Sequence, residues 1–443
     1  MSNWINESVF YHFYVMGFCG APERNDFHSE PVERLMKTVE WIPHLKNIGV
    51  NAVVFSPIFE SMSHGYDTVD YFRVDRRLGT NDTLKRVVQE FHANGIRVVL
   101  DGVFNHSSRE FFAFKDIKTY RENSNYKNWY KNLRFNCDNC YRDGFSYEGW
   151  AGHFELVKFN LDNHDTREHI FEAVRMWIKE FDIDGLRLDA ADVIDFRFLS
   201  DLSKVSKSIK PDFWLKGEVV HGDYKRWINE AGLDSVTNYE AYKGLWSSFN
   251  DKNFFEINYS LNRQFGDNGL CKGKTLYNFL DNHDVDRITE TLKNHRNLAA
   301  LYGLLFTMPG VPSVYYGSEF GIKGKRSANS DKELRPNLSL DMFNNENDRR
   351  FLSSIKKLAD IRKNHKALKY GDYKTLLVST ETLAFSRNFE GETIVVCLNC
   401  SDGEKTLNLP INLNAARELT INEEIRGGEV YIAANGIKII KAG

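Results

Sequence analysis

A cation and a carboxylate two residues apart, Arg187 and Asp189, are the first candidates for chemistry in this chain. They lie in the apolar run 185–190, which follows the amphipathic stretch 167–181 and is predicted to be a strand. Residues two apart in a strand share a face, so we expect the two side chains to lie together. A neighbouring guanidinium favours the ionised form of an acid, as a nucleophilic carboxylate requires. An ordinary ion pair at a strand end would show the same spacing.

Other polar residues follow apolar runs elsewhere in the chain. Glu218 ends the run 213–218, and Asp284 follows the run 276–281. Each could alone be a cap or a turn residue, because aspartate and asparagine favour such positions. Their repeated occurrence after strand-like runs indicates a shared site. The candidates of this kind are Tyr66, Asp101, Asn105, His106, Glu218, His283 and Asp284.

Strand-like and helical runs alternate along most of the chain. Helical patterns such as 32–48, 84–93 and 167–181 separate eight strand-like runs. This alternation predicts an α/β fold, a (β/α)₈ TIM barrel, with an open doubly wound sheet as the alternative. The predicted strands are 9–15, 50–55, 96–101, 185–189, 213–218, 234–239, 276–281 and 314–316.

Two segments break the alternation and predict further domains. The irregular, aromatic and polar segment 107–152 is interpreted as a loop domain inserted after strand 3. Residues 368–443 show only short strand-like runs and predict a C-terminal antiparallel β-sandwich domain. The catalytic barrel is then formed by 1–106 and 153–367.

The C-terminal ends of barrel strands build the site in such folds, so the carboxylates after strands 4, 5 and 7 should converge. Metal binding and glycosyl transfer both suit clustered carboxylates, but an arginine cannot ligate a metal. Glycoside cleavage accounts for both the clustered carboxylates and the arginine. Asp189 is predicted to attack the anomeric carbon, Glu218 to act as acid and base, and Asp284 to hold sugar hydroxyls.

The remaining candidates are predicted to contact the substrate. His106 and His283 would donate hydrogen bonds to sugar hydroxyls, and Tyr66 would stack beneath the ring. Arg287, three residues after Asp284, is included with Arg187 as a substrate-binding candidate. A nucleophilic Asp189 implies that the reaction retains the anomeric configuration.

Composition excludes several classes of partner. The net charge of −3 over 443 residues provides no broad basic surface for nucleic acid or an anionic membrane. No apolar run is long enough to span a bilayer, and no signal peptide is visible, so we expect a cytoplasmic protein. The pairs Cys137/Cys140 and Cys397/Cys400 are expected to be reduced thiols rather than one zinc site.

The strand-end residues resemble a known family. Segments 49–59 and 310–319 resemble the second and eighth strands of the α-amylase family, glycoside hydrolase family 13. The family's four signature regions are similar to 101–106, 185–189, 217–219 and 282–284. The resemblance implies a retaining enzyme that acts on α-glucosidic bonds, with Asp189 as nucleophile, Glu218 as acid/base and Asp284 as third carboxylate. It also implies that Asp101 supports Arg187.

Within the family, segments 65–72, 147–150 and 159–162 are similar to cyclomaltodextrinases, neopullulanases and maltogenic amylases. His221, three residues after Glu218, also resembles that group and is a substrate-binding candidate. Val220 departs from it, because many members carry an aromatic residue there. Those enzymes usually have an N-terminal β-domain that builds a dimer, whereas the barrel here begins almost at once; the oligomeric state is left open.

Calcium is not expected. Family members with a structural ion use an asparagine that matches Asn105 and a histidine that matches Val193, which has no donor atom. Asn105 is instead predicted to tie the loop domain to the barrel by hydrogen bonds. We therefore predict no metal and no cofactor.

The resulting hypothesis is a retaining glycoside hydrolase that cleaves α-1,4 bonds of maltodextrins or cyclodextrins. A transglycosylase or an α-1,6-acting glucosidase on the same machinery is one alternative. A noncatalytic sugar-binding protein is another, but members of that kind have usually lost the three carboxylates retained here.

Overall fold

The computed structural model describes residues 4–328, 330–343, 346–413, 415–425 and 429–443. The chain forms two compact units. Unit 1 consists of Met1–Ser2, Phe13–Ile42 and Val53–Val236, and unit 2 of Asn3–His12, Pro43–Ala52 and Thr237–Gly443. Among the described residues, no helix has both the length and the apolar character needed to cross a membrane.

An eight-stranded sheet forms the centre of the fold, as expected for a (β/α)₈ barrel. Its strand order is β11-β10-β9-β5-β2-β1-β13-β12, and neighbouring strands such as β5 and β9, or β1 and β13, are parallel. The strands are β1 Phe10–Phe13, β2 Ala52–Phe55, β5 Arg97–Gly102, β9 Gly185–Leu188, β10 Trp214–Gly217, β11 Ser235–Val236, β12 Tyr277–Asn278 and β13 Val311–Tyr315.

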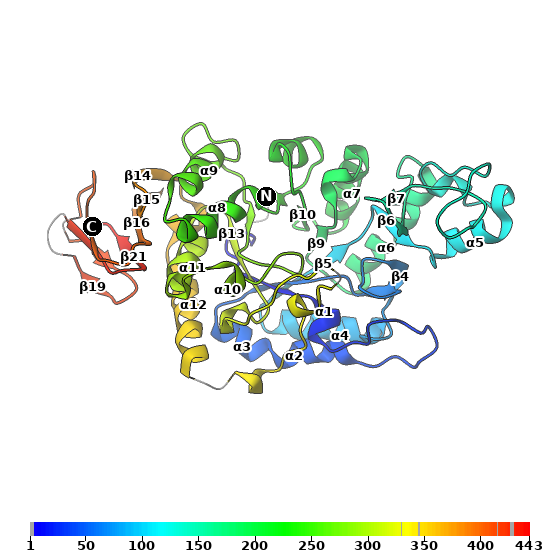
Figure 1. The fold of residues 1–443 in the computed structure, drawn as a ribbon, viewed down its shortest axis with the longest axis horizontal. Helices are drawn as coiled ribbons and strands as arrows, with labels where there is room; N and C mark the ends of the chain where they lie inside the picture. The colour runs from blue at the N-terminus through cyan, green and yellow to red at the C-terminus, as the bar shows by residue number, and fades with distance from the viewer. Residues whose placement is uncertain (1–3, 329, 344–345, 414, 426–428) are drawn as a thin grey trace. The chain divides into compact units, whose positions relative to one another are not determined.

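Strands β2, β9 and β10 are buried along their whole length, as is usual for parallel strands covered on both faces. Helices α4 (Asn81–Ala93), α6 (His164–Glu180) and α7 (Phe196–Ile209) accompany them (Figure 1). Each begins at a polar cap: the Asn163 side chain, for example, accepts a hydrogen bond from the Thr166 N–H before α6. The apolar face of α6 includes Trp177, which stacks on Phe59 of β3 (Phe59–Ser61) with 4.1 Å between ring centroids.

The predicted helix 32–48 is broken into shorter pieces. A 3₁₀ turn, Arg34–Met36, leads into α2 (Lys37–Glu40), and α3 (Ile42–Asn47) follows after Trp41. Pro43 lacks the N–H that a continuous helix needs, which explains a break at this point. The predicted C-terminal Gly49 has a φ of 78°. A Cβ there would also lie 2.7 Å from that of Ala359.

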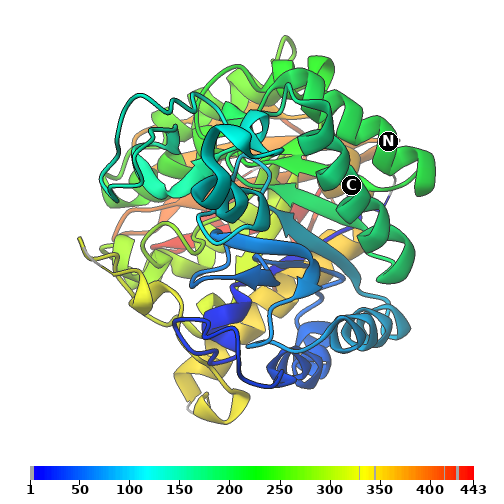
Figure 2. The same cartoon turned by 90° about the vertical axis from the view of Figure 1, so that its right-hand side faces the viewer.

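The inserted segment is more regular than its sequence suggests. Strands β6 (His106–Ser108) and β7 (Gly149–Trp150) pair with β8 (His153–Lys158), which lies beyond the predicted end of the segment, in the order β6-β8-β7, and α5 spans Phe112–Tyr120. Figure 2 shows this part of unit 1, in cyan, facing the viewer. The sequence pattern missed α5 because the helix is short and presents only Ala113, Phe114 and Ile117 to the core.

The C-terminal part of unit 2 is the expected antiparallel β-structure. Six strands form one sheet in the order β14-β15-β16-β21-β18-β19, and β17 pairs with β20. Apolar residues of both sheets, including Val395, Ile440, Val430 and Ile432, share one core. The strands are β14 Lys374–Val378, β15 Thr382–Phe389, β16 Glu392–Asn399, β17 Lys405–Asn408, β18 Arg417–Glu418, β19 Glu423–Glu424, β20 Glu429–Ile432 and β21 Gly436–Lys441.

Candidate active site

One guanidinium joins three carboxylates in unit 1. Arg187 of β9 is 3% exposed. Its Nη1 lies 2.7 Å from Asp101 Oδ2 and 3.0 Å from Asp189 Oδ1, and its Nη2 lies 2.6 Å from Glu218 Oε1. The structure thus brings the predicted nucleophile and acid/base to the same cation.

The strand register accounts for this arrangement. Asp101 of β5 is the Cα partner of Arg187 in the parallel pair β5–β9, so both residues reach the same level of the sheet. Asp189 directly follows β9, and Glu218 directly follows β10. The Ala190 N–H also donates to Glu218 Oε2 at 3.1 Å, which ties the acid to the residue that follows Asp189.

Burial and charge act against each other at this centre. Burial raises the pKa of Asp101 above its ordinary value, although Arg187 and the Tyr66 hydroxyl counteract part of this effect. Burial also disfavours the charge of Arg187, yet the carboxylates of Asp101 and Glu218 raise its pKa well above the ordinary range. Arg187 is therefore a permanent cation beside Asp189, as a carboxylate nucleophile requires.

Two further charged residues at this centre were missed by the sequence analysis. Lys216 of β10 is 3% exposed and is the Cα partner of Arg187 in the pair β9–β10. Burial, followed by the nearby Arg187, lowers its pKa to about 7. Burial and the charge of Glu218 raise the pKa of Asp192. Strand spacing could have found Lys216, because it lies two residues before Glu218 and so on the same face.

Tyr66 and His106 are held by protein groups. The Tyr66 hydroxyl donates to Asp101 Oδ2 at 3.0 Å. His106 Nδ1 lies 3.2 Å from the Asn105 amide nitrogen, and Nε2 lies 3.0 Å from the Tyr66 carbonyl oxygen. With the amide as donor to Nδ1, the ring proton resides on Nε2 and already has an acceptor. Burial lowers the His106 pKa to about 4, so the ring is neutral at pH 7.

These contacts correct the role predicted for His106, whereas stacking of the Tyr66 ring beneath a sugar stays a prediction. His106 does not present a free N–H to a sugar in this structure but anchors the backbone of Tyr66. The Tyr66 hydroxyl supports Asp101, and the Arg187 guanidinium lies 5.6 Å from the centre of the Tyr66 ring. Sequence spacing could not reveal this, because the partners lie 35 and 40 residues away along the chain.

Asn105 connects to its surroundings mainly through its backbone. Its carbonyl oxygen accepts a hydrogen bond from the Phe159 N–H at 3.0 Å, while its side chain contacts His106. Val193 is 50% exposed and provides no donor atom. Within the described ranges, no group of three or more histidine, cysteine, aspartate or glutamate residues is arranged to hold a metal ion. All six cysteines, which lie within those ranges, are free thiols.

Unit 2 contains the third carboxylate. His283 Nε2 lies 3.1 Å from Asp284 Oδ2, and Arg335 Nη2 lies 3.5 Å from Asp284 Oδ1. The His283 ring also packs edge-on against His12, with 5.3 Å between centroids. Asp284 keeps 37% of its side chain exposed, so it remains accessible to a ligand. The sequence analysis missed Arg335, which lies 51 residues beyond Asp284 and has no recognisable motif.

The prediction that Arg287 binds substrate is wrong. The residue is wholly buried. Its Nη1 donates to the Tyr316 carbonyl at 2.6 Å, its Nη2 donates to the Leu334 carbonyl at 2.8 Å, and the guanidinium lies 4.1 Å from the Tyr315 ring centre. It therefore stabilises the packing of the segments that follow β13, through hydrogen bonds to their carbonyl groups. Sequence distance from Asp284 was a poor guide, because the chain turns into α10 (Ile288–Thr291) at this point.

His221 lies outside the guanidinium cluster. It is exposed in the segment after β10. The neighbouring Val220 is 38% exposed, and its N–H lies 3.4 Å from Asp192 Oδ2. A role for His221 in substrate binding stays a prediction.

Comparison with known proteins agrees with this geometry. The family described as "Alpha amylase, catalytic domain" matches residues 35–350. The chain is 31% identical over 457 residues to a cyclomaltodextrinase of Thermoanaerobacter pseudethanolicus, and 28% identical over 472 residues to a maltogenic alpha-amylase of Bacillus acidopullulyticus. Each alignment covers 99% of this chain and 78% of the relative. A solved cyclomaltodextrinase structure superimposes with a TM-score of 0.88 at 27% identity, over 100% of this chain and 79% of the other. The protein is therefore a member of the α-amylase family and a glycoside hydrolase.

Proposed function

We propose that the protein hydrolyses α-1,4-glucosidic bonds of maltodextrins or cyclodextrins by double displacement, with retention of configuration. The observation that carries the proposal is the shared guanidinium: Asp189 and Glu218 both lie within 3.0 Å of Arg187. Retention requires two carboxyl groups roughly 5 Å apart. The pairing of both acids with one guanidinium supports a short separation of this kind.

In the first step, an Asp189 oxygen attacks the anomeric carbon and the bond from that carbon to the leaving oxygen breaks. Glu218 transfers its proton to the leaving oxygen. In the second step, Glu218 takes a proton from water, the water oxygen bonds to the anomeric carbon, and Asp189 is released as a carboxylate. Arg187 stabilises the ionised Asp189 at the start and end of this cycle.

Asp284 and His283 are proposed to hold sugar hydroxyls. The support is chemical: Asp284 is partly exposed, and its second oxygen faces the Arg335 guanidinium rather than a buried partner. A carboxylate of this kind can accept hydrogen bonds from two neighbouring hydroxyls as positive charge develops on the ring.

We further propose that the protein works in the cytoplasm and without a metal. The thiols of Cys137 and Cys140 are exposed and unpaired, a state that a reducing compartment maintains. At the position where some family members carry a histidine ligand, Val193 has no donor atom. The double displacement needs only the carboxylates and Arg187, so the chemistry is complete without a cofactor.

Replacing the nucleophile tests the function. Asp189→Asn should reduce turnover of maltotriose and β-cyclodextrin by about 10⁴-fold or more, because the amide cannot form the glycosyl ester. Asp267→Asn, at a carboxylate whose side chain is 97% exposed, is the matched control and should leave turnover unchanged. The anomer first released by the wild-type enzyme, followed by proton NMR, should be α. Full activity of Asp189→Asn, or initial release of the β anomer, would contradict the proposal.

A further inference from the structure

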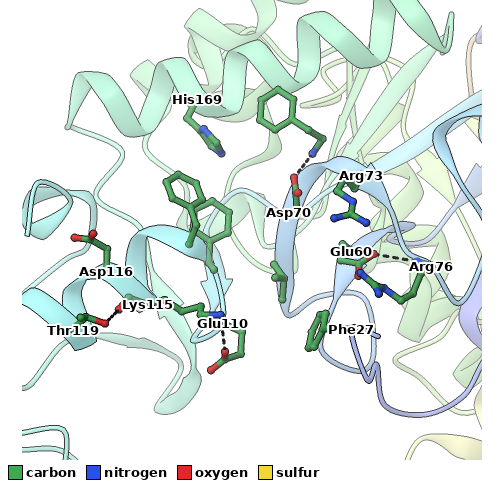
Figure 3. A pocket seen from close by; sticks show the side chains of 14 residues that line it. Phe27, Glu60, Asp70, Arg73, Arg76, Glu110, Lys115, Asp116, Thr119 and His169 are labelled. Carbon is green, nitrogen blue, oxygen red and sulfur yellow. Dashed lines mark hydrogen bonds and ion pairs between the residues drawn. The ribbon is translucent and has the colours of Figure 1, made fainter. Parts of the chain in front are cut away.

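A cavity in unit 1 is lined by none of the residues of the guanidinium cluster. It has a volume of about 680 Å³ and is a groove between α5 of the inserted segment and the hairpin of β3 and β4 (Thr68–Val74), as Figure 3 shows. None of the 14 residues that line it is among the predicted site residues. Its size falls within the range typical of small-molecule sites, about 300–1,000 Å³.

Aromatic rings line the groove from three separate elements. Phe112 of α5 is 42% exposed, Phe72 lies on β4, and Phe27 comes from the segment before α2. Phe112 and Phe72 each lie 5.2 Å from the ring of His169, measured between centroids. Phe112 also packs against Trp129 at 5.6 Å, so its position is fixed although its outer face is open. Rigid, partly exposed rings are suited to the apolar faces of a ligand.

The groove is lined by four carboxylates and three basic side chains, so positive charge is not in excess. Glu60 pairs with Arg76 at 2.8 Å on the hairpin side, and Glu110 pairs with Lys115 at 3.7 Å on the α5 side (Figure 3). The groove therefore has no excess of positive charge that would select a phosphate or a nucleic acid. The lining therefore favours a neutral ligand.

Two other charged residues that line the groove, Arg73 and Asp70, can form further hydrogen bonds. Arg73 is exposed, and within the described part of the chain its guanidinium has no hydrogen-bond or ion-pair partner. Asp70, which also lines the groove, accepts the Phe72 N–H at 2.8 Å with one oxygen. A guanidinium with unused donors and a carboxylate with a remaining acceptor oxygen can bind neighbouring hydroxyls.

We propose that this groove is a second glucan-binding site, which holds an α-glucan chain without cleaving it. The identity of the ligand rests on the proposed function; the requirement for a neutral, hydroxyl-rich molecule with flat apolar faces rests on the groove itself. Cleavage does not occur there, because the groove contains no pair of carboxylates that share a guanidinium as Asp189 and Glu218 do.

Binding to an inactive enzyme tests this directly. We would titrate Asp189→Asn with maltoheptaose in a calorimeter and expect two sites per chain. Adding Arg73→Gln, at an exposed and unpaired side chain, should weaken one site at least fivefold and leave the other unchanged. Adding Phe112→Ala should have the same effect, with its melting temperature measured to confirm folding. A single site that neither substitution alters would overturn the proposal.

Matched controls and a kinetic arm separate this proposal from the proposed function. Arg417→Gln and Phe255→Ala replace exposed residues of unit 2 and should not change binding. With Asp189 intact, Arg73→Gln should leave kcat/KM for a nitrophenyl maltoside unchanged and raise KM for soluble starch about threefold. If the wild-type enzyme cleaves no glucan but the groove variants still lose one site, only the proposed function fails. If cleavage is normal and both variants bind as their parent does, only the groove proposal fails.

Discussion

Arg187 and Glu218 form an ion pair with 2.6 Å between Nη2 and Oε1, while the other terminal nitrogen of the same guanidinium contacts Asp101 and Asp189. The cation therefore positions both proposed reacting acids at once. Its surroundings are almost completely buried, so few water molecules can replace it if it is lost. This dependence leads to the first prediction.

Arg187→Met should reduce kcat/KM for β-cyclodextrin by roughly 10²–10³-fold, because the transition state loses a preorganised cation. It should also lower the free energy of unfolding by about 3–5 kcal/mol, since the buried Asp101 loses its partner. Activity assays and urea unfolding at pH 7 measure the two effects. Arg187→Lys should recover part of the activity, because it keeps the charge but not the planar fork. Arg197→Met, at a side chain that is 74% exposed, should change neither quantity.

Lys216 predicts an unusual dependence of stability on pH. Its folded-state pKa of about 7 lies below the ordinary value of 10.5, so between these values the unfolded chain binds the additional proton. The contribution of Lys216 to the free energy of unfolding therefore rises with pH across this window, with a slope approaching ~1.4 kcal/mol per pH unit near its middle. Urea unfolding between pH 6 and pH 10 measures the slope.

Lys216→Met should remove this part of the pH dependence, because methionine has a similar length and no proton to lose. Lys207→Met is the comparison, at a lysine that is 32% exposed and pairs with Asp234. If the slope of Lys216→Met equals that of the wild-type enzyme, Lys216 does not titrate in this window.

Asp184 predicts a stability effect away from the active site. The carboxylate has a side-chain exposure of 1% and contacts His92, Arg97 and Lys210 at 2.7, 2.7 and 3.0 Å. Burial opposes its charge, but these partners hold its pKa well below the ordinary value, so its stabilising contribution is present near neutral pH and disappears as pH falls through the acid range. Asp184→Asn should lower the free energy of unfolding at pH 7 by about 3 kcal/mol.

The neighbouring Asp182 provides the control for this substitution. Its side chain is 68% exposed, so Asp182→Asn should change the free energy of unfolding by less than about 0.5 kcal/mol. Thermal and urea unfolding of both variants give the comparison. Equal effects of the two substitutions would show that the Asp184 contacts contribute no more than a surface pair.

Arg335 predicts a substrate-binding effect in unit 2. Its contacts with Asp284 and Asp331 should orient Asp284 toward sugar hydroxyls. Arg335→Ala should raise KM for maltotriose about tenfold or lower kcat by a similar factor. Arg326→Ala also removes an arginine that pairs with Asp331, but this arginine is 60% exposed and should have little effect. Indistinguishable kinetics of the two variants would remove Arg335 from the site.

The sequence predicted the barrel strands because parallel strands buried on both faces require continuous apolar runs. It also predicted that Arg187 and Asp189 lie together, because side chains in a strand alternate between two faces and residues two apart share a face. Residues at the ends of neighbouring parallel strands lie at the same edge of the sheet, so their proximity could be predicted from the strand positions alone. The position of Glu218 next to Arg187 follows from the same reasoning.

The failures concern partners that no periodicity encodes. Arg287 lies close to Asp284 along the chain, yet it binds carbonyl groups inside the fold. His106 was expected to face the ligand, but its second nitrogen binds the Tyr66 carbonyl. In both cases, the hydrogen-bond partner depends on how loops pack on one another. For the predicted helix 32–48, Pro43 indicated a break, but the prediction followed the helical spacing of the apolar residues instead.

The pairing of β5 with β9 has a consequence for how the enzyme matures. Asp101 faces Arg187 only in the register observed, and a slip of β9 against β5 by one residue would turn the guanidinium away from Asp101. Catalytic power thus cannot appear in a partly assembled barrel. During refolding, recovery of turnover reports the moment at which these two strands have locked together.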